Sequence, residues 1–226
     1  MQELVSAFER RTATDVVFDQ LHDDIGSLKI LPGTKLSETE VAQRFGVSRQ
    51  PVRDAFSRLE NLDLLLIRPQ KATEVRGFSL QRVAHARFVR LAIELEVIQH
   101  ACSVWTTEQA QKLEQNLIQQ QQSIEAEQPE RFHTLDYEFH KLICDLSGLP
   151  MAFETILECK KKIDRLCILS FDRANEPVTL LEDHRRLAHA LETGSAEKAV
   201  AIARQHLGRL DSTIRDIHTA HPEYFE

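Results

Sequence analysis

Residues 45–59, FGVSRQPVRDAFSRL, hold the pattern that decides the fold of the N-terminal part of the chain. Ser48 is a favourable N-cap, and Pro51 lies in the first turn, where its missing N–H breaks no helical hydrogen bond. Four apolar residues follow at the spacing i, i+3, i+4, i+7, namely Val52, Ala55, Phe56 and Leu59. This spacing predicts a helix with one face packed on a core.

The other face of this helix is polar and carries side chains suited to DNA. On a helical wheel it holds Gln50, Arg53, Asp54, Ser57 and Arg58, and Arg49 flanks the apolar stripe in the first turn. An Arg side chain can bind phosphate or guanine and a Gln can pair with adenine, so the helix suits a major groove. The alternative for an isolated pattern of this length is an ordinary amphipathic surface helix.

The residues before this helix favour the DNA-binding interpretation. Pro32-Gly33 is a turn signal, and SETE (37–40) is a capping box that opens a short helix through Phe45. Gly46 then allows a tight turn into the second helix. Two short helices joined by a tight turn predict a helix-turn-helix.

The residues after the helix predict a wing. Apolar residues 64–67 and residues 73–75 flank the turn-forming segment PQKA (69–72), as expected for a short β-hairpin. A wing in this position would lay Lys71 beside the DNA backbone or the minor groove. The first 70 or so residues therefore predict a winged helix-turn-helix.

The segment ILPGTKLSETEVAQRFGVSRQPVRDAFSRLENLDLL (30–65) closely resembles the DNA-binding domain of GntR-family bacterial transcription regulators. It departs from the family at residues 61–64, where Asn-Leu-Asp-Leu stands in place of the usual Glu-Gly-Leu. It departs again in the wing tip, where Lys71-Ala72 replaces Arg-Gly, so the shape of the wing stays open. The pattern and the resemblance together give the candidate DNA-binding residues Ser48, Arg49, Gln50, Arg53 and Lys71.

Length and composition set the remaining bounds. A chain of 226 residues is long enough for two modest domains. No apolar run approaches the 18 residues of a membrane span and no signal peptide precedes the first helix, so we expect a cytoplasmic protein without a membrane partner. The four cysteines form no CxxC pair, and we expect buried free thiols.

The net charge of −7 is unevenly distributed along the chain. Residues 44–76 carry seven Arg and Lys against four acids, whereas residues 77–226 carry 17 basic and 23 acidic residues. A local excess of positive charge is expected where one face meets phosphate and the rest of the protein does not.

From residue 79 onward the pattern is helical, and we expect helices near 79–105, 107–127, 129–146, 151–172, 177–193 and 196–218. Thr107 and Ser195 are the expected caps. The polar run QNLIQQQQ (115–122) is interpreted as a solvated helix face. The predicted fold is mainly α, with a winged helix-turn-helix over residues 1–76, a hinge at 77–79 and an all-helical bundle over 80–226.

Several polar side chains lie on the apolar stripes of these helices. His184 and His206 lie in the middle of their stripes, and Asp136 and His140 border a third stripe as i, i+4 partners. Each needs a buried partner, and a divalent metal ion would satisfy all four. Polar groups satisfied within the core are the alternative, and periodicity alone does not decide between the two.

Residues 135–148 (LDYEFHKLICDLSG), 182–194 (EDHRRLAHALETG) and 201–207 resemble the metal-ligand motifs of the all-helical FCD domain, found in the FadR subfamily of GntR regulators. The resemblance implies a divalent metal ion (Zn, Ni or Mn) with the ligands Asp136, His140, His184 and His206. Gly148-Leu149 departs from the family's Gly-Asn. His133 and Cys144, which share a helix side with His140, are competing ligands.

In the FCD family the cavity that holds the metal also binds small carboxylates, commonly sugar acids or hydroxy acids, and the resemblance implies such an effector here. A nearby cation would help to hold such an anion. Arg90 is the first candidate, because it lies four residues before Glu94 on a mostly apolar helix, and Arg165 is the second. A structural Arg90–Glu94 salt bridge is an equal alternative.

These observations predict a ligand-responsive transcriptional regulator, not an enzyme. It would bind a divalent metal and a small carboxylate, and act as a homodimer on an inverted-repeat operator. A metalloenzyme that uses the three-His, one-Asp site is the competing class, although no residue pair near the ligands resembles a dedicated general base. A purely architectural DNA-binding protein would leave the inward histidines unexplained.

Overall fold

The computed structural model describes residues 11–169 and 176–226. The described chain divides into two compact units. The first holds the residues up to Ser79 together with Glu223–Glu226, and the second holds Leu80–Pro222.

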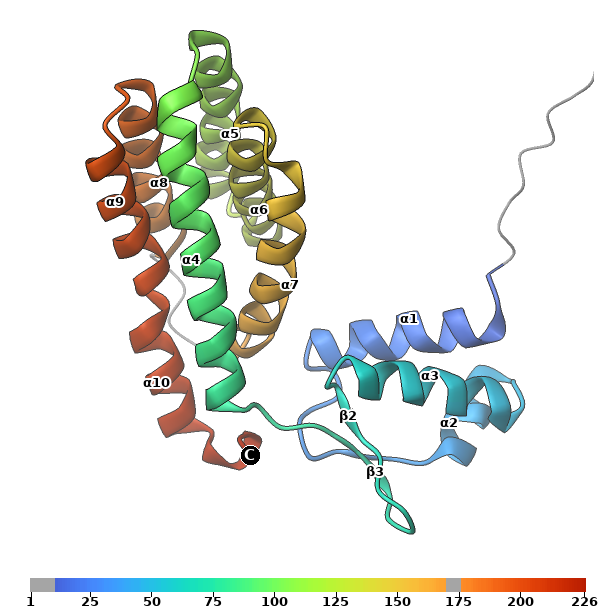
Figure 1. The fold of residues 1–226 in the computed structure, drawn as a ribbon. Helices are drawn as coiled ribbons and strands as arrows, with labels where there is room; N and C mark the ends of the chain where they lie inside the picture. The colour runs from blue at the N-terminus through green and yellow to red at the C-terminus, as the bar shows by residue number, and fades with distance from the viewer. Residues whose placement is uncertain (1–10, 170–175) are drawn as a thin grey trace, which may run out of the picture. The chain divides into compact units, whose positions relative to one another are not determined.

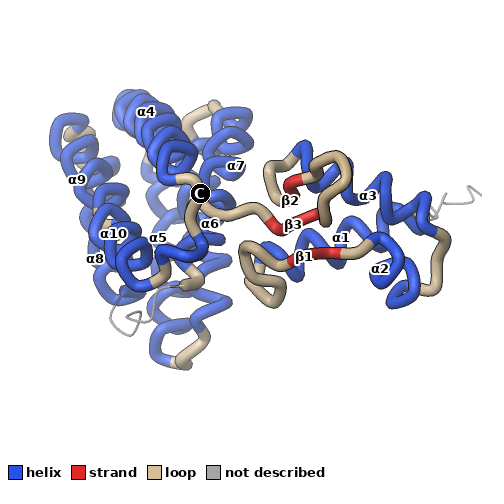
Figure 2. The backbone as a smooth tube through the Cα atoms, turned by 90° about the horizontal axis from the view of Figure 1, so that it is seen from below, coloured by secondary structure: helices blue, strands red, loops and turns tan. Residues whose placement is uncertain are grey.

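In its described residues, the first unit combines three helices with a three-stranded sheet (Figures 1 and 2). The elements are α1 (Ala13–Gly26), β1 (Lys35–Leu36), α2 (Glu38–Phe45), α3 (Arg49–Asn61), β2 (Leu65–Leu66) and β3 (Thr73–Val75). All pairing is antiparallel in the order β1-β3-β2. The predicted winged helix-turn-helix is confirmed, and β1 adds a strand to the expected hairpin.

The core of the first unit lies between α1 and the apolar stripe of α3. All four stripe residues of α3 are fully buried, and they pack with the buried face of α1, formed by Val17, Leu21 and Ile25. The helix-turn-helix bend also follows the sequence. The Ser37 hydroxyl accepts a hydrogen bond from the Glu40 N–H, and Gly46 ends α2 with φ of 64°, a conformation that costs a residue without Cβ little.

Residues 223–226 complete the first unit by pairing with the segment that follows β3. The Phe78 N–H donates to the Tyr224 carbonyl at 2.8 Å, and the Glu226 N–H donates to the Phe78 carbonyl at 3.0 Å. The Phe78 and Phe225 rings lie 5.7 Å apart. A Cβ on Gly77 would approach the Tyr224 carbonyl oxygen to 3.0 Å, so glycine permits this close pairing.

The second unit is helical throughout its described residues. In chain order its helices are α4 (Leu80–Val104), α5 (Thr107–Glu125), α6 (Pro129–Leu146), α7 (Pro150–Cys167), α8 (Glu176–Glu192), α9 (Ala196–Gly208) and α10 (Leu210–Ala220), followed by the short 3-10 helix η1 (Pro222–Tyr224). The long helix α4 packs against α7 and α9, and α5 packs against α6 and α8 (Figure 1). The mainly α fold is as predicted.

Three boundaries differ from the expected helices. The cap of α5 is Thr106 and not Thr107, because the Thr106 hydroxyl and the Gln109 amide form a reciprocal capping box. The expected helix 196–218 is interrupted at Arg209, whose N–H bonds the His206 carbonyl three residues back at 3.3 Å. Helix α7 ends at Cys167, and residues 170–172 of the expected helix lie outside the described residues.

The polar run 115–122 is not simply a solvated face, as the sequence suggested. Asn116 and Gln120 are buried, at 5% and 0% exposure, next to the apolar Leu113 and Leu117. Their amides are accepted in the core because they are hydrogen-bonded there. The cysteines are free thiols: Cys102 is half-buried, and the other three are buried.

Candidate metal centre and DNA-binding surface

The exposed face of α3 carries the predicted DNA-binding residues. Arg49 and Arg53 are more than half exposed, and both reach one carboxylate on α2, that of Glu38. Arg49 Nη2 and Arg53 Nη2 lie 2.9 and 3.0 Å from Glu38 Oε2. Hydrogen bonds from Arg53 and then Arg49 lower the pKa of Glu38, which keeps the carboxylate charged.

The other predicted DNA-binding residues are also exposed. Gln50 bonds Asp54 at 2.8 Å, and Lys71 lies in the turn between β2 and β3. Ser48 occupies the N-cap position of α3, but its hydroxyl makes no side-chain cap bond. Arg58 has a structural role, because it pairs with Asp15 at 2.8 Å and lies 3.9 Å above the Phe18 ring.

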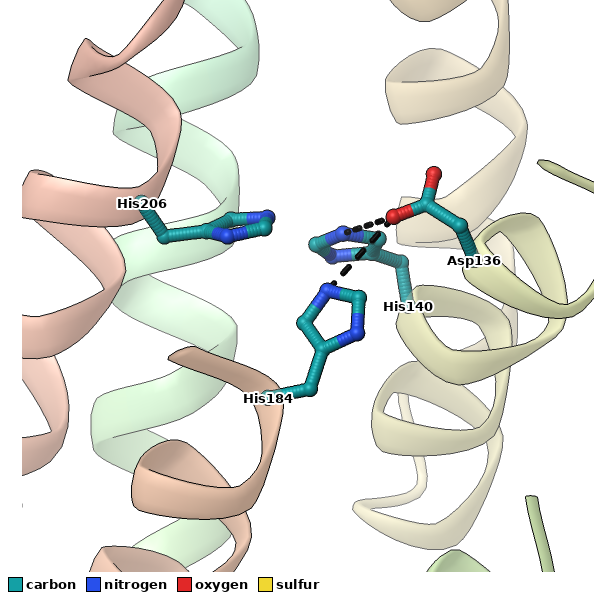
Figure 3. Close-up of side chains that lie close together, drawn as sticks. All are labelled: Asp136, His140, His184 and His206. Carbon is teal, nitrogen blue, oxygen red and sulfur yellow. Dashed lines mark ion pairs between the residues drawn. The ribbon is translucent and has the colours of Figure 1, made fainter. Parts of the chain in front are cut away.

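In the second unit, the four predicted metal ligands converge in the core from three helices (Figure 3). Asp136 and His140 come from α6, His184 from α8 and His206 from α9, and none is more than 6% exposed. One donor atom from each lies within 4.8 Å of the others. Donors about 2.0–2.2 Å from one ion lie at most about 4.4 Å apart, so small side-chain shifts would bring all four onto a metal.

The centre contains buried nitrogen atoms that the protein does not satisfy. His140 Nε2, His184 Nε2 and His206 Nδ1 have no hydrogen-bond partner. His184 Nε2 and His140 Nε2 lie 3.5 and 3.8 Å from Asp136 Oδ1, too far for a hydrogen bond. Unsatisfied polar atoms are rare in protein interiors, and the two beside Asp136 Oδ1, His140 Nε2 and His184 Nε2, form with that oxygen a donor set that suits a cation.

Oxygen atoms lie behind the imidazole rings. Glu94 Oε2 is 2.7 Å from His140 Nδ1, and Gln120 Oε1 is 2.9 Å from His184 Nδ1. Asp183 Oδ2 is 3.6 Å from His206 Nδ1, beyond hydrogen-bond distance. Carboxylates and amides in such positions orient histidines that ligate metals.

The electrostatics keep the ligands in the state that binds metal. Burial lowers the pKa of His184 well below its usual range and lowers that of His206, so both rings are neutral at pH 7. Burial alone would raise the pKa of Asp136, but the Lys160 ammonium outweighs it and holds that pKa well below normal. Neutral imidazole and ionised carboxylate are the forms that ligate.

Lys160 is a buried contact of the centre that the sequence analysis missed. Its Nζ lies 2.6 Å from Asp136 Oδ2, so that oxygen is occupied and Oδ1 is the one turned to the histidines. The lysine is one of three in a row at 160–162, but only Lys160 stands at helical spacing from the buried Ile156 and Ile163. That spacing was the available signal.

The two predicted effector-binding arginines have different environments. Arg90 is buried, and its Nε lies 2.6 Å from Glu94 Oε1, so the ion pair considered as the alternative is present. Burial would raise the pKa of Glu94, but His140 and Arg90 lower it. Arg165 is half-buried in the last turn of α7, and burial lowers its pKa to about 10.

The competing ligands do not join the centre. His133 is more than half exposed, and its Nε2 lies 3.5 Å from Asp164. Cys144 is buried, and its pKa is raised to about 12, mainly by burial, so it remains a thiol that ligates metal poorly. Neither residue belongs to the group formed by the four converging side chains.

Comparison with known proteins adds independent information. Residues 13–75 match the family described as bacterial regulatory proteins, gntR family, and residues 86–209 match the FCD domain. This chain belongs to the GntR family. Members of the family bind operator DNA through the helix-turn-helix, and its named relatives are transcriptional regulators, not enzymes.

Relatives of this GntR-family regulator cover most of its length. It is 38% identical over 209 residues to the HTH-type transcriptional repressor RspR of Escherichia coli, covering 92% of each chain. It is 23% identical to the gluconate operon transcriptional repressor of Bacillus subtilis, covering 82% of this chain and 78% of that one. In fold it resembles McbR/YncC of E. coli, with a TM-score of 0.68 at 20% identity over 91% of this chain and 98% of that one. No described helix is long and apolar enough to cross a bilayer.

Proposed function

We propose that this regulator, of the FadR subfamily, binds one divalent metal ion through Asp136, His140, His184 and His206, and that the ion helps to bind a small carboxylate that modulates operator binding. The observation that carries the proposal is the pair of unsatisfied, buried imidazole nitrogens beside Asp136 Oδ1, His140 Nε2 and His184 Nε2, with His206 converging on the same group. A cation at their centre removes the cost of leaving these atoms unpaired.

The residues present fit a transition-metal ion. Three imidazole nitrogens and one carboxylate oxygen suit Zn²⁺, Ni²⁺ or Mn²⁺ better than Ca²⁺ or Mg²⁺, which favour oxygen donors. Because Lys160 occupies Asp136 Oδ2, the aspartate offers one oxygen. A bound ion with five or six coordination positions would then supply open positions to an anionic effector.

The proposed effector is a small carboxylate, such as a sugar acid or a hydroxy acid. The buried Arg90 guanidinium, which interacts with Asp136, supports an anion at the centre, and Arg90 and Arg165 are the proposed effector-binding residues. Arg90 already pairs with Glu94, so an effector would have to share or replace that contact. The likeness to a gluconate operon repressor supports the sugar-acid class.

For the DNA step we propose that Ser48, Arg49, Gln50, Arg53 and Lys71 contact an inverted-repeat operator. Their exposure on α3 and in the wing supports this assignment. A homodimer would present two DNA-binding units to two half-sites. Residues 77–79 would act as the hinge in each copy together with residues 223–226, because Phe78 is paired with that segment. A metalloenzyme is not supported by the family or by the named relatives.

The deciding experiment measures metal content and ligand response together. Protein purified without chelators and refilled with Zn²⁺, Ni²⁺ or Mn²⁺ should hold one ion per chain. The variants His184→Ala and His206→Ala should lose it while keeping their helical circular dichroism. His189→Ala, an exposed histidine on α8, is the matched control and should bind normally. Wild type without stoichiometric metal would reduce the four residues to polar groups of the core.

The effector is then sought by a thermal-shift screen of sugar acids and hydroxy acids, with and without chelator. A true effector should raise the unfolding temperature of the metal-loaded protein and lose this effect when the metal is removed. It should also change the protein's affinity for operator DNA.

A further inference from the structure

A chain of buried amides runs behind His184, on the polar segment of α5. Asn116 Nδ2 donates to the Leu135 carbonyl on α6 at 3.1 Å. Gln120 Nε2 donates to Asn116 Oδ1 at 2.7 Å, and Gln120 Oε1 faces His184 Nδ1 at 2.9 Å. Asn116, Gln120 and His184 are all buried, so a polar group that left this set of hydrogen bonds would remain unsatisfied in the core.

The direction of every hydrogen bond in this chain follows from the backbone carbonyl at its end. A carbonyl only accepts, so Asn116 must present its NH₂ group to Leu135 and its oxygen to Gln120. Gln120 must then present its own NH₂ group to Asn116, which turns its oxygen to the imidazole. Reversing either amide would set two donors or two acceptors against each other in the core. His184 therefore has to donate, and its Nδ1 has to carry the proton.

We propose that Asn116 and Gln120 are positioning residues of the metal centre, which hold His184 as the Nδ1–H tautomer and leave Nε2 as the ligating atom. This inference rests on the proposed metal function. In water the neutral imidazole of histidine favours the opposite tautomer, so the protein has to impose this one. The neutral amide does so without adding charge to a site that already holds several ionised groups.

The hydrogen bonds that link Asn116, Gln120 and His184, here called the amide relay, also prevent a hydrogen bond from His184 to Asp136. If the neutral ring carried its proton on Nε2, a small shift of the side chain would let it donate to Asp136 Oδ1, which lies 3.5 Å away. With the proton held on Nδ1, the bare Nε2 faces that carboxylate oxygen as one acceptor faces another (Figure 3). A cation between the two atoms turns this unfavourable contact into two ligand bonds.

The first test reads the tautomer directly in the metal-free full-length protein. Long-range ¹H–¹⁵N NMR on ¹⁵N-histidine-labelled protein distinguishes protonated from bare ring nitrogens, and a His184→Gln sample identifies the signal. We expect a protonated Nδ1 and a bare Nε2 for His184 near neutral pH. A neutral His184 with the proton on Nε2 would overturn the proposal, whether or not metal binds.

The second test measures Zn²⁺ affinity by competition with a chelator. Gln120→Leu removes the acceptor and should weaken Zn²⁺ binding about 10–100-fold, the usual loss for residues that orient a ligand. Asn116→Leu touches no ligand, but it frees Gln120 to turn, so it should also weaken binding and should move the His184 proton toward Nε2. Gln120→Glu keeps an oxygen for Nδ1–H, so the His184 proton should stay on Nδ1. Its second oxygen then faces Asn116 Oδ1 as one acceptor faces another, so this variant should lose stability while keeping the tautomer.

Gln119→Leu is the matched control, because Gln119 lies in the same polar run but is exposed. It should bind Zn²⁺ as wild type does. Circular dichroism and thermal unfolding of the metal-free variants show whether a variant has lost only the orientation of the His184 ring or its fold as well. Wild-type affinity in a folded Gln120→Leu protein would overturn the proposal. A wild type that binds no Zn²⁺ would instead defeat the proposed function, and the tautomer measurement would still decide whether the amide relay exists.

Discussion

At the scale of single residues, one carboxylate pairs with cationic side chains in each site, Glu38 with two arginines and Asp136 with Lys160. Glu38 holds both Arg49 and Arg53 on the exposed face of α3. In the metal centre, Asp136 divides its two oxygens between Lys160 and the histidines. In both places a short, buried or half-buried acid fixes longer side chains that would otherwise lose more conformational entropy on binding.

The first prediction concerns the arginines of α3. Arg53→Ala and Arg49→Ala should each lower operator affinity by about 1–3 kcal/mol if the side chain reads a base edge. Arg58→Ala should instead lower the stability of the first unit, because Arg58 pairs with Asp15 and covers Phe18. Fluorescence anisotropy with operator DNA and thermal unfolding measure the two effects. Unchanged operator affinity in both Arg49→Ala and Arg53→Ala would remove the assignment.

The second prediction concerns Glu38. Glu38→Gln removes the charge that both arginines face, so they should bind phosphate more freely. Affinity for a scrambled duplex should rise more than affinity for the operator, and the specificity ratio should fall. Glu40→Gln, an exposed acid in the same first turn of α2, is the control. An unchanged ratio of the two affinities in Glu38→Gln would show that Glu38 does not position Arg49 and Arg53 for sequence-specific contacts.

The third prediction is a dependence on pH. The pKa values of His184 and His206 are lowered in the folded protein, so the unfolded chain takes up protons first as pH falls. The metal-free protein should therefore lose stability as pH drops through the ordinary imidazole value of 6.5. Metal affinity should fall in the same range, because a protonated ring cannot ligate. Thermal unfolding of wild type and His184→Ala between neutral and mildly acidic pH tests this, and the variant should show the weaker dependence.

At the scale of elements, the break between α9 and α10 is tied to the metal centre. Arg209, at the break, reaches Asp183 on α8 through Nε at 2.5 Å and Nη2 at 3.0 Å. Asp183 is buried and directly precedes His184. This fork-like pair fastens the end of α9, which carries His206, to the helix that carries His184.

The fourth prediction tests this fastening. Arg209→Leu leaves the buried Asp183 carboxylate without its main partner and should cost about 1–3 kcal/mol of stability. It should also weaken metal binding, because His206 loses its fixed place relative to His184. Arg204→Leu, an exposed arginine on α9, is the control. Chemical denaturation and chelator competition give the two readouts, and a fully stable variant with normal metal affinity would contradict the role of the pair.

Sequence periodicity predicted the main helices and the inward positions of the four polar side chains of the candidate metal centre, because apolar stripes and inward polar residues follow the helix repeat. Their assignment as a ligand set came from the family resemblance and stays a prediction. Periodicity did not foresee the two residues of β1, since so short a strand has no periodicity of its own. It also misplaced Asn116 and Gln120 at the surface, because an amide residue is usually exposed and the hydrogen bonds that permit its burial come from other helices. The break at Arg209 was missed although Gly208 directly precedes it, because an isolated glycine within a helical pattern does not by itself end a helix. The contact of Arg209 with Asp183 on α8 is a tertiary feature that the pattern does not contain.

At the scale of the whole molecule, the chain passes between the two units twice, at residues 79–80 and 222–223. A ligand in the second unit can change DNA binding only by its differential affinity for the DNA-competent and DNA-incompetent arrangements, typically about 1–3 kcal/mol. Two covalent connections restrict those arrangements more than one would.

The fifth prediction is reciprocity between the two ligands. Operator DNA should change the affinity for the effector by the same factor by which the effector changes the affinity for DNA. Removing the metal with a chelator should abolish this mutual effect and leave the basal DNA affinity largely intact. Isothermal titration of effector with and without operator measures the factor. An effector affinity that ignores the operator would refute the coupling.

The pairing of residues 223–226 with Phe78 affects how the DNA-binding domain can be exchanged between relatives. Phe78 is only 4% exposed, and the distant end of the described chain supplies its partners. Covering a side chain of this size is worth about 1.5–3 kcal/mol. A chimera made by one exchange near residue 79 would combine the DNA-binding domain of one relative with the C-terminal residues of another. Phe78 and residues 223–226 would then be mismatched, so a stable chimera needs a second exchange point near residue 222. Exchange of the DNA-binding domain in this architecture therefore needs two exchange points, and the domain and the C-terminal segment should change together between relatives.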